Sequence, residues 1–565
     1  MQNLDWIVIT LYFGLIGWVA WWYGRHQKDT KDYFLAGRNA GWVVIGASIF
    51  TSNIGSEHIV GLAGQGAATG MAMAHWELHA WCLIVLAGFF VPFYYKSGVE
   101  TIPEFLERRF SARTRLVLSC VSLVAYVFTK VSVTVYAGAI VFQALLPEIS
   151  FTIGDFTANA FWIGAFSTVI ITGVYTVFGG MRAIMNTSTP QAVIILFGSF
   201  VITYIGLEKL GGWGELVSMA KANKEAFALW RPLSDPDFPW LGVLIASPII
   251  GIWYWCTDQY IVQRALSAKD LATARRGALF GGLLKIWPVL IFLVPGMIGW
   301  ALHQKGIITL PPKIVGGVEV GGIDGDQVFP TLVKALLPTG IRGLIVACLL
   351  AALMSSLASL FNSSASLFTI DIYEKIRPGR SQKHLLNVGR IATAAVVVLG
   401  ILWIPVMAKI SGGGLYQYLQ SVQGYLAPPI TAVFIIGLCW KRINSAGATW
   451  GLVGGFILGM LKLTMQTFYG TGKIETPTIF AAIGDFNFLY ATGVLLLASA
   501  VIIVVVSLMT PPPPAEKVNG LTYGSIKETA GAEIGKSWDM GNKVLSGTIL
   551  VLVLGLYLYF SFWLS

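Results

Sequence analysis

The sequence predicts an all-α polytopic membrane protein with about 14 transmembrane helices, and two observations lead to this fold class. Of its 565 residues, 55% are hydrophobic and only 12% are charged, whereas soluble domains carry about 25% charged residues. Apolar runs of about 20 residues, long enough to cross a bilayer as helices, recur along nearly the whole chain. This composition excludes a cytosolic enzyme. It also excludes a nucleic-acid-binding protein despite the net charge of +10, because membrane proteins gather lysine and arginine in cytoplasmic loops.

Hydropathy gives the positions of the expected spans in chain order. The first apolar run lacks a basic n-region and a small-residue cleavage site, so we expect it to be a retained span rather than a signal peptide. The expected spans lie near 4–23, 41–66, 71–94, 114–146, 154–177, 187–207, 239–263, 277–302, 343–373, 391–408, 415–439, 445–466, 487–510 and 544–564.

The distribution of basic residues predicts the orientation. Of the 38 lysines and arginines, 25 fall in one set of alternate loops, ten in the other and three within spans. Because cytoplasmic loops carry the excess of positive charge, both termini are expected outside a plasma or inner membrane. The largest segments between spans are 208–238, 303–342 and 511–543, so no soluble domain is expected.

Polar residues inside the early spans mark the first candidate site. The second span contains Thr51 to His58, a run with glycine and small polar side chains at its centre. Such residues suit an unwound helix whose carbonyls face a cavity, or else a polar contact between helices. Glu77 near the start of the third span is either a snorkelling end residue or a ligand group.

Later spans carry further candidates. The seventh span places aromatic rings beside hydrogen-bonding groups from Trp253 to Gln259, which suits sugar binding or an interfacial aromatic belt. Lys285 in the eighth span is either a site residue or a side chain that reaches the surface. In the ninth span Ala352, Ser355 and Ser356 share one helix face. Their oxygens could bind a hard cation such as sodium, or the serines could simply pack between helices.

At these residues the chain resembles the sodium/solute symporter family, and specifically its sodium–glucose cotransporter branch. The resemblance covers residues from about 30 to 460 in order and rests on these segments: Asp32–Arg38, Ser52–Gly55, Thr101–Phe105, Trp253–Gln259, Ser355–Ser359, Asp371–Tyr373, Gln417–Gln420 and Trp440–Arg442.

The resemblance implies a fold and a division of the chain. The family fold is a five-plus-five inverted repeat (LeuT-type) whose first helices are broken near the bilayer midplane. One extra helix precedes the repeats and three follow them. We therefore expect an N-terminal helix and cytoplasmic loop at 1–40, repeats at 41–207 and 239–439, an extracellular loop at 208–238, and the extra C-terminal helices at 440–565.

The resemblance also implies the ligand sets. Sodium would be bound by the carbonyls of Thr51, Ile54 and Ala352 and the hydroxyls of Ser355 and Ser356. The implied solute-binding residues are Asn53, His58, Glu77, Tyr254, Trp255, Lys285 and Gln420. Tyr254 would also serve as inner gate, and the implied outer gate consists of Leu62, Trp76 and Tyr416.

Two positions depart from the family pattern. Gly251 stands where bacterial sugar members can place an asparagine ligand, so one solute contact is lost or replaced. Ser188 stands where members with a second sodium site place an aspartate. The second departure predicts one sodium ion per transport cycle.

The sequence thus predicts a secondary active transporter that couples inward sodium movement to uptake of a neutral sugar similar to glucose or galactose. Sodium is the co-transported ion, the bilayer is the environment, and no catalytic motif or organic cofactor is expected. Alternatives are a sodium-coupled symporter of another solute, such as myo-inositol, and a sodium-gated sugar sensor. Glu77 argues against anionic solutes, because like charges repel, but nothing in the sequence separates glucose from inositol.

Overall fold

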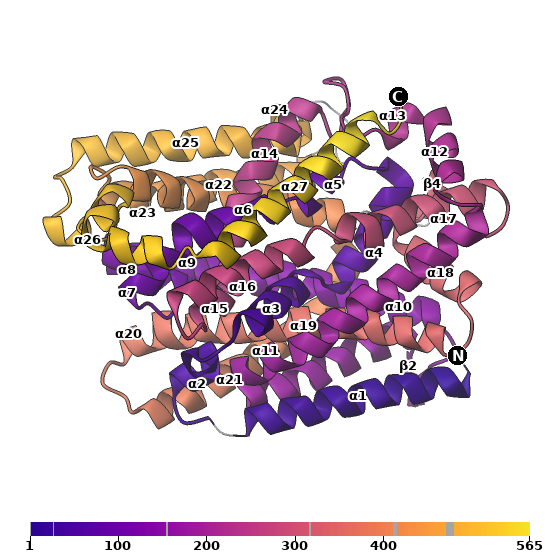
Figure 1. Ribbon diagram of the computed structural model, residues 1–565, viewed down its shortest axis with the longest axis horizontal. Helices are drawn as coiled ribbons and strands as arrows, with labels where there is room; N and C mark the ends of the chain where they lie inside the picture. The colour runs from indigo at the N-terminus through magenta and orange to yellow at the C-terminus, as the bar shows by residue number, and fades with distance from the viewer. Residues whose placement is uncertain (1, 26, 154–155, 316–317, 411–414, 470–478) are drawn as a thin grey trace.

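The computed structural model describes residues 2–25, 27–153, 156–315, 318–410, 415–469 and 479–565. Within these ranges the protein is a bundle of helices that run mostly along its longest axis, with both chain ends at the same end of the bundle (Figure 1). Two short antiparallel hairpins lie between helices: β1 (Phe151–Ile153) with β2 (Phe156–Ala158), and β3 (Pro312–Val315) with β4 (Val318–Ile323).

Eleven helical runs in the described part of the chain are long and apolar enough to cross a membrane. They confirm the all-helical membrane fold. The helices in these runs are α1 (Asn3–Gly24), α5 (Ala74–Glu77), α6 (Ala80–Val85), α7 (Val91–Ser97), α11 (Ala160–Leu210), α14 (Trp240–Ile252), α16 (Leu271–Leu284) with α17 (Val294–Gln304), α19 (Ile341–Ser366) with α20 (Glu374–Ile376), α21 (Gln382–Ile410), α22 (Leu415–Cys439), α23 (Ser445–Tyr469), α25 (Phe488–Met509) and α27 (Met540–Phe562).

The remaining helices are shorter. Those within expected spans are α3 (Trp42–Asn53), α4 (Ser56–Thr69), α9 (Ala112–Ala125), α10 (Ser132–Leu145) and α15 (Gln259–Leu266). Those that connect spans are α2 (Thr30–Leu35), α8 (Ile102–Arg109), α12 (Trp213–Ala222), α13 (Lys224–Phe227), α18 (Val328–Leu336), α24 (Ile479–Asp485) and α26 (Tyr523–Lys536).

Helix α11 differs from the expectation of two spans separated by a loop near 178–186. The helical run is continuous except at Gly180, where the backbone has φ +54°. A Cβ atom at this position would lie 2.8 Å from the carbonyl oxygen of Tyr33. Glycine therefore allows the chain to change direction within a single residue, and the two expected spans meet at a kink instead of the loop that hydropathy predicted.

The first helix of each predicted repeat is broken, as the fold class implies. Helix α3 ends at Asn53, Ile54 and Gly55 are extended, and α4 begins at Ser56. In the second repeat α14 leads into a π-helical turn (Trp253–Thr257), Asp258 is extended, and α15 begins at Gln259. Both breaks leave backbone polar groups that the helix no longer satisfies.

The broken helices lie inside the bundle, beside α19. Of the most apolar stretch within Ile341–Ile376, 94% is buried, against 28% in α1 and in α25 and 22% in α27. Helices α1 and α25 form opposite edges of the bundle in Figure 1, and α27 crosses its near face. The apolar outer faces of these peripheral helices suit contact with lipid.

Candidate functional site

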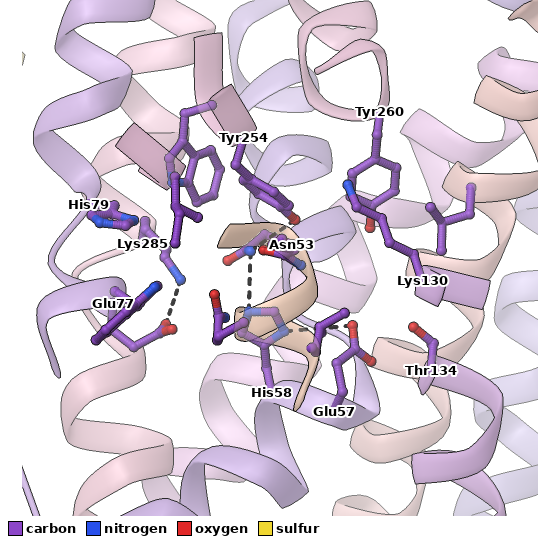
Figure 2. Close-up of a pocket in the computed structure, with 17 residues that line it drawn as sticks. Asn53, Glu57, His58, Glu77, His79, Lys130, Thr134, Tyr254, Tyr260 and Lys285 are labelled. Atoms are coloured by element: carbon purple, nitrogen blue, oxygen red, sulfur yellow. Dashed lines mark hydrogen bonds and ion pairs between the residues drawn. The ribbon is translucent and has the colours of Figure 1, made fainter. Parts of the chain in front are cut away.

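The two helix breaks meet at a buried pocket in the interior of the bundle (Figure 2). Its lining comes from the breaks themselves and from the ends of several other helices. The lining residues are Asn53, Glu57, His58, Trp76, Glu77, His79, Lys130, Thr134, Ile250, Tyr254, Trp255, Tyr260, Lys285, Leu360, Leu419, Gln420 and Gln423. All seven predicted solute-binding residues are among them.

A buried ion pair occupies one side of the pocket. Lys285, which directly follows α16, places Nζ 2.5 Å from Oε2 of Glu77, the last residue of α5. The two residues are 2% and 0% exposed. Burying either charge alone would be costly, so each charge compensates the other. The pair presents carboxylate oxygens and an ammonium group to whatever enters the pocket, a combination that can accept and donate hydrogen bonds to hydroxyls.

The first break supplies two polar side chains beside this pair. The Nδ2 group of Asn53 lies 3.3 Å from Nε2 of His58 and donates to the hydroxyl of Tyr254 at 3.1 Å. Asn53 Oδ1 is buried and has no hydrogen-bond partner among the described residues. The contact to Tyr254 joins the end of α3 to the π-helical turn of the second break.

The second break adds an aromatic surface to the pocket, and α22 adds another hydrogen-bond acceptor. The ring of Tyr254 packs edge-on against Trp255, with centroids 4.9 Å apart. Gln420 on α22 is buried, and its Oε1 has no partner in the described part of the chain. Unsatisfied buried acceptors that face a pocket are suited to accept hydrogen bonds from a polar ligand.

The predicted outer gate is only partly brought to the pocket. Trp76 lines it, and its ring lies 6.1 Å from that of Phe238. Leu62 is fully buried on α4 but is not part of the lining. The side chain of Tyr416 lies outside the described residues, so its predicted role stays a prediction.

The predicted sodium ligands lie where α19 crosses the first break. The amide of Gly55 donates to Asn53 O and that of His58 to Gly55 O, instead of to the carbonyls of Thr51 and Ile54 as in an unbroken helix. On α19, Ser356 Oγ donates to Ser52 O at 3.0 Å. Ser355 Oγ is buried without a partner among the described residues, and Ala352 is buried one turn away. Carbonyl and hydroxyl oxygens of this kind are ligands that hard cations prefer.

Sequence reasoning did not assign Lys130 and Asp258 to the site, although both are charged residues within spans. Asp258 stands at the second break, where its Oδ1 accepts the amide of Tyr260 at 3.2 Å and caps α15. Lys130 Nζ lies 2.5 Å from Asp258 Oδ2, and the Tyr126 hydroxyl also donates to this carboxylate. The ammonium group is 4.8–5.0 Å from four ring centroids, those of Tyr126, Trp253, Tyr254 and Tyr260.

A third residue that was not assigned to the site, His79, lies beside Gly251. A Cβ atom on Gly251 would lie 3.2 Å from the His79 ring and 2.8 Å from Cys82 Sγ. The imidazole lines the pocket and its Nε2 is 2.7 Å from Ser247 Oγ. The space beside Gly251 is thus occupied by a histidine from the turn between α5 and α6, a proximity that appears only in the packed structure.

Ser188, at the other departure, is fully engaged within the protein. Its hydroxyl donates to Ile184 O at 2.7 Å and lies 3.3 Å from Ser48 Oγ. A serine in this setting has less to offer a cation than an aspartate, which carries a full negative charge.

Comparison with protein-family models identifies the family to which the chain belongs. The model of the sodium:solute symporter family matches residues 33–455. This chain belongs to the sodium:solute symporter family. The resemblance predicted from the sequence is confirmed, and the protein is a multi-pass membrane transporter of the sodium-coupled symporter class rather than an enzyme.

The chain is also similar to individual sodium-coupled cotransporters and to solved structures. Sodium/glucose cotransporter 4 from Danio rerio is 39% identical over 522 residues, which cover 88% of this chain and 77% of that protein. The human sodium/myo-inositol cotransporter is 37% identical over 528 residues, 87% of this chain and 72% of that protein. Among solved structures, a Na⁺-coupled sialic acid symporter in a substrate-bound outward-open state has a TM-score of 0.75 at 19% identity and covers 90% of this chain and 99% of its own; this likeness supports the fold.

Proposed function

We propose that this protein couples the inward movement of one sodium ion to the uptake of a neutral sugar or cyclic polyol, and that the pocket at the two helix breaks is its transport site. The observation that carries the proposal is the arrangement at the first break. One side of the break faces the pocket through Asn53 and His58. The break also frees the carbonyls of Thr51 and Ile54 from the helical amides of Gly55 and His58, and α19 contacts the same segment through the hydrogen bond from Ser356 Oγ to Ser52 O.

The pocket's chemistry supports a hydroxyl-rich solute. The Glu77–Lys285 pair can accept and donate hydrogen bonds. The acceptors Asn53 Oδ1 and Gln420 Oε1, which have no partner among the described residues, belong to side chains that line the same pocket. The ring of Tyr254 offers a flat face on which the C–H face of a pyranose can stack. The ion pair makes this side of the pocket neutral, which suits an uncharged ligand.

Sodium and solute share the first break, which gives a physical route for coupling. Sodium bound by Thr51, Ile54, Ala352, Ser355 and Ser356 would hold the break in one arrangement. Asn53 and His58 would then be positioned for the solute. Coupling requires that each ligand binds one of the two alternating states better than the other.

One sodium ion supplies enough free energy for this function. A charge that crosses about 100 mV releases roughly 2.3 kcal/mol, and a tenfold sodium gradient adds about 1.4 kcal/mol. Together these could concentrate a neutral solute roughly 500-fold. The engagement of Ser188 by Ile184 and Ser48 supports a single ion per cycle.

The solute itself has two candidates. Similar curated relatives are named as sodium/glucose and sodium/myo-inositol cotransporters, at 39% and 37% identity. Both solutes are neutral six-membered rings that carry several hydroxyls, and the pocket chemistry described above fits either of them.

The test is uptake into proteoliposomes that contain the purified protein. Labelled glucose, galactose and myo-inositol are each offered with an inward sodium gradient or with choline in its place. The proposal predicts that at least one of these solutes is accumulated with sodium and not with choline. Equal uptake under both conditions would contradict it, and sodium currents without solute accumulation would indicate a sensor.

Glu77 gives a residue-level check of the same proposal. Glu77→Ala removes the pocket carboxylate, so sugar binding should be lost, with KM raised by about 100-fold or more, while sodium affinity changes little. The matched control is Glu208→Ala, because Glu208 is an exposed glutamate on α11 away from the pocket. Equal loss of sodium and sugar binding would assign Glu77 a structural role.

A further inference from the structure

A second carboxylate, Glu57, lies in the pocket and has no role in the site described so far. Glu57 is the second residue of α4, directly after the first break, and is 7% exposed. Its carboxylate folds back over Gly55 so closely that a Cβ atom on Gly55 would overlap it. The absence of a side chain at Gly55 therefore leaves space for the Glu57 carboxylate beside the unwound segment.

The carboxylate of Glu57 is incompletely satisfied. Oε2 is buried and has no hydrogen-bond partner among the described residues. Oε1 lies 3.7 Å from Nδ1 of His58, beyond hydrogen-bond distance. A buried carboxylate oxygen without a partner is costly, so its presence in a native site calls for a ligand.

Neither lysine of the pocket forms its ion pair with Glu57. Lys285 forms its ion pair with Glu77, and Lys130 forms its ion pair with Asp258. In the described part of the chain, Glu57 is thus the pocket carboxylate without a lysine or arginine partner. Figure 2 shows Glu77 and Glu57 on opposite sides of His58, so the two carboxylates face the pocket from different directions.

We propose that Glu57 is a specificity-determining residue. Its carboxylate accepts hydrogen bonds from hydroxyls on the ring edge of the solute opposite to the edge that Glu77 binds. This inference rests on the proposed function and deepens it, because the solute must carry hydroxyls on two opposed edges. The carboxylate serves the solute rather than sodium, since Glu57 lines the pocket whereas Ser355 and Ser356 do not. A hydrogen bond to a carboxylate is strong enough to discriminate between solutes that differ by a single hydroxyl.

The experiment measures KM for the transported solute and for its single-deoxy analogues, in proteoliposomes with saturating sodium. In the unaltered protein, removal of a hydroxyl should raise KM at two separate ring positions or more. Glu57→Ala should raise KM of the parent solute by about 10- to 100-fold. In Glu57→Ala, removal of one particular ring hydroxyl from the solute should no longer raise KM. In Glu77→Gln the same should hold for a hydroxyl at a different ring position.

Three further variants sharpen this test. Glu57→Gln keeps the size and one acceptor, so its KM should lie between those of the unaltered protein and Glu57→Ala. Gly55→Ala places a methyl group where the carboxylate lies and should weaken binding at the same deoxy position as Glu57→Ala. Glu208→Ala, the exposed control, should leave every KM unchanged.

The outcomes separate this inference from the proposed function. If the unaltered protein shows no sodium-driven uptake, both are wrong. If uptake is sodium-driven but Glu57→Ala and Glu57→Gln leave the solute KM within twofold, the inference alone is overturned. A changed sodium affinity with an unchanged solute KM would assign Glu57 to the ion. Preference of the unaltered protein for an amino sugar over the parent, lost in Glu57→Ala, would assign it to an ammonium group instead of hydroxyls.

Discussion

The two helix breaks lie in the first helices of the two predicted repeats but are built from different groups. At the first break the carbonyls of Thr51 and Ile54 no longer accept the helical amides of Gly55 and His58. Helix α19 reaches this break through the Ser356 hydroxyl, which donates to Ser52 O. At the second break Asp258 is bound by the ammonium group of Lys130, beneath four aromatic rings. The second break therefore already contains a cation that belongs to the protein, and we infer that the first break instead receives its cation from outside.

This difference indicates a division of labour between the repeats. At the second break the cation is the side chain of Lys130, so this break should keep its geometry whether or not sodium and solute are bound. Within the described part of the chain, the first break has no such side chain beside its carbonyl oxygens, so it should be stabilised only when a sodium ion binds. We infer that sodium acts on the first break and that the Lys130–Asp258 pair keeps the second break as a fixed partner for it.

The largest expected effect comes from breaking the resident pair. Asp258→Asn leaves the ammonium group of Lys130 buried without its counter-charge, which should lower the free energy of unfolding by about 3–5 kcal/mol. Thermal unfolding of the purified variants in detergent measures this loss. The double variant Lys130→Met with Asp258→Asn should recover much of it, because no uncompensated charge remains. If Asp258→Asn were as stable as the unaltered protein, the Lys130–Asp258 pair would not be what stabilises the second break.

A smaller and different effect is expected at the first break. Ser355→Ala removes a hydroxyl that has no partner among the described residues, so stability should hardly change. The sodium concentration for half-maximal uptake should rise about 10- to 100-fold, as expected for a lost polar contact to a charge.

The matched control for Ser355→Ala is Ser364→Ala. Ser364 is also buried on α19 without a hydrogen-bond partner among the described residues, but it lies more than two helical turns after Ser355, towards the end of α19. Its replacement should leave sodium activation unchanged. Equal effects of the two substitutions would mean that helix packing, and not ion binding, explains the result for Ser355.

The smallest effect is expected at Ser188. Its hydroxyl is engaged by Ile184 and Ser48, so Ser188→Ala should shift the sodium dependence of uptake less than twofold. The ratio of sodium to solute fluxes should stay at about one. A flux ratio near two in the unaltered protein, reduced to one by Ser188→Ala, would show that a second sodium site exists on this side of the first break.

The sequence predicted the first break better than the second. Thr51 to His58 combines glycine with small polar residues in an apolar span, a pattern that local chemistry alone makes unusual. Asp258 follows an aromatic run near the end of its span and can be interpreted as an interfacial residue. Its role depends on Lys130, 128 positions earlier, and only the packed structure brings the two together.

The same reasoning explains which pocket residues were found. Glu77 and Lys285 were noticed because charged side chains inside spans are rare, and the resemblance gave them roles. His79 was not, because its place in the pocket depends on its proximity to Gly251, a residue that lies far from it in the sequence. Glu57 was visible in the sequence, but its unsatisfied oxygen and its position over Gly55 are properties of the folded chain.

Amide hydrogen exchange with and without sodium tests the central claim most directly. The protein is compared in sodium and in choline at equal ionic strength, with peptides that cover 50–58 at the first break and 254–262 at the second. The account predicts that sodium slows exchange at the first break and leaves the second almost unchanged, and that Ser355→Ala abolishes the difference. Equal protection of both breaks, or protection of the second alone, would contradict it.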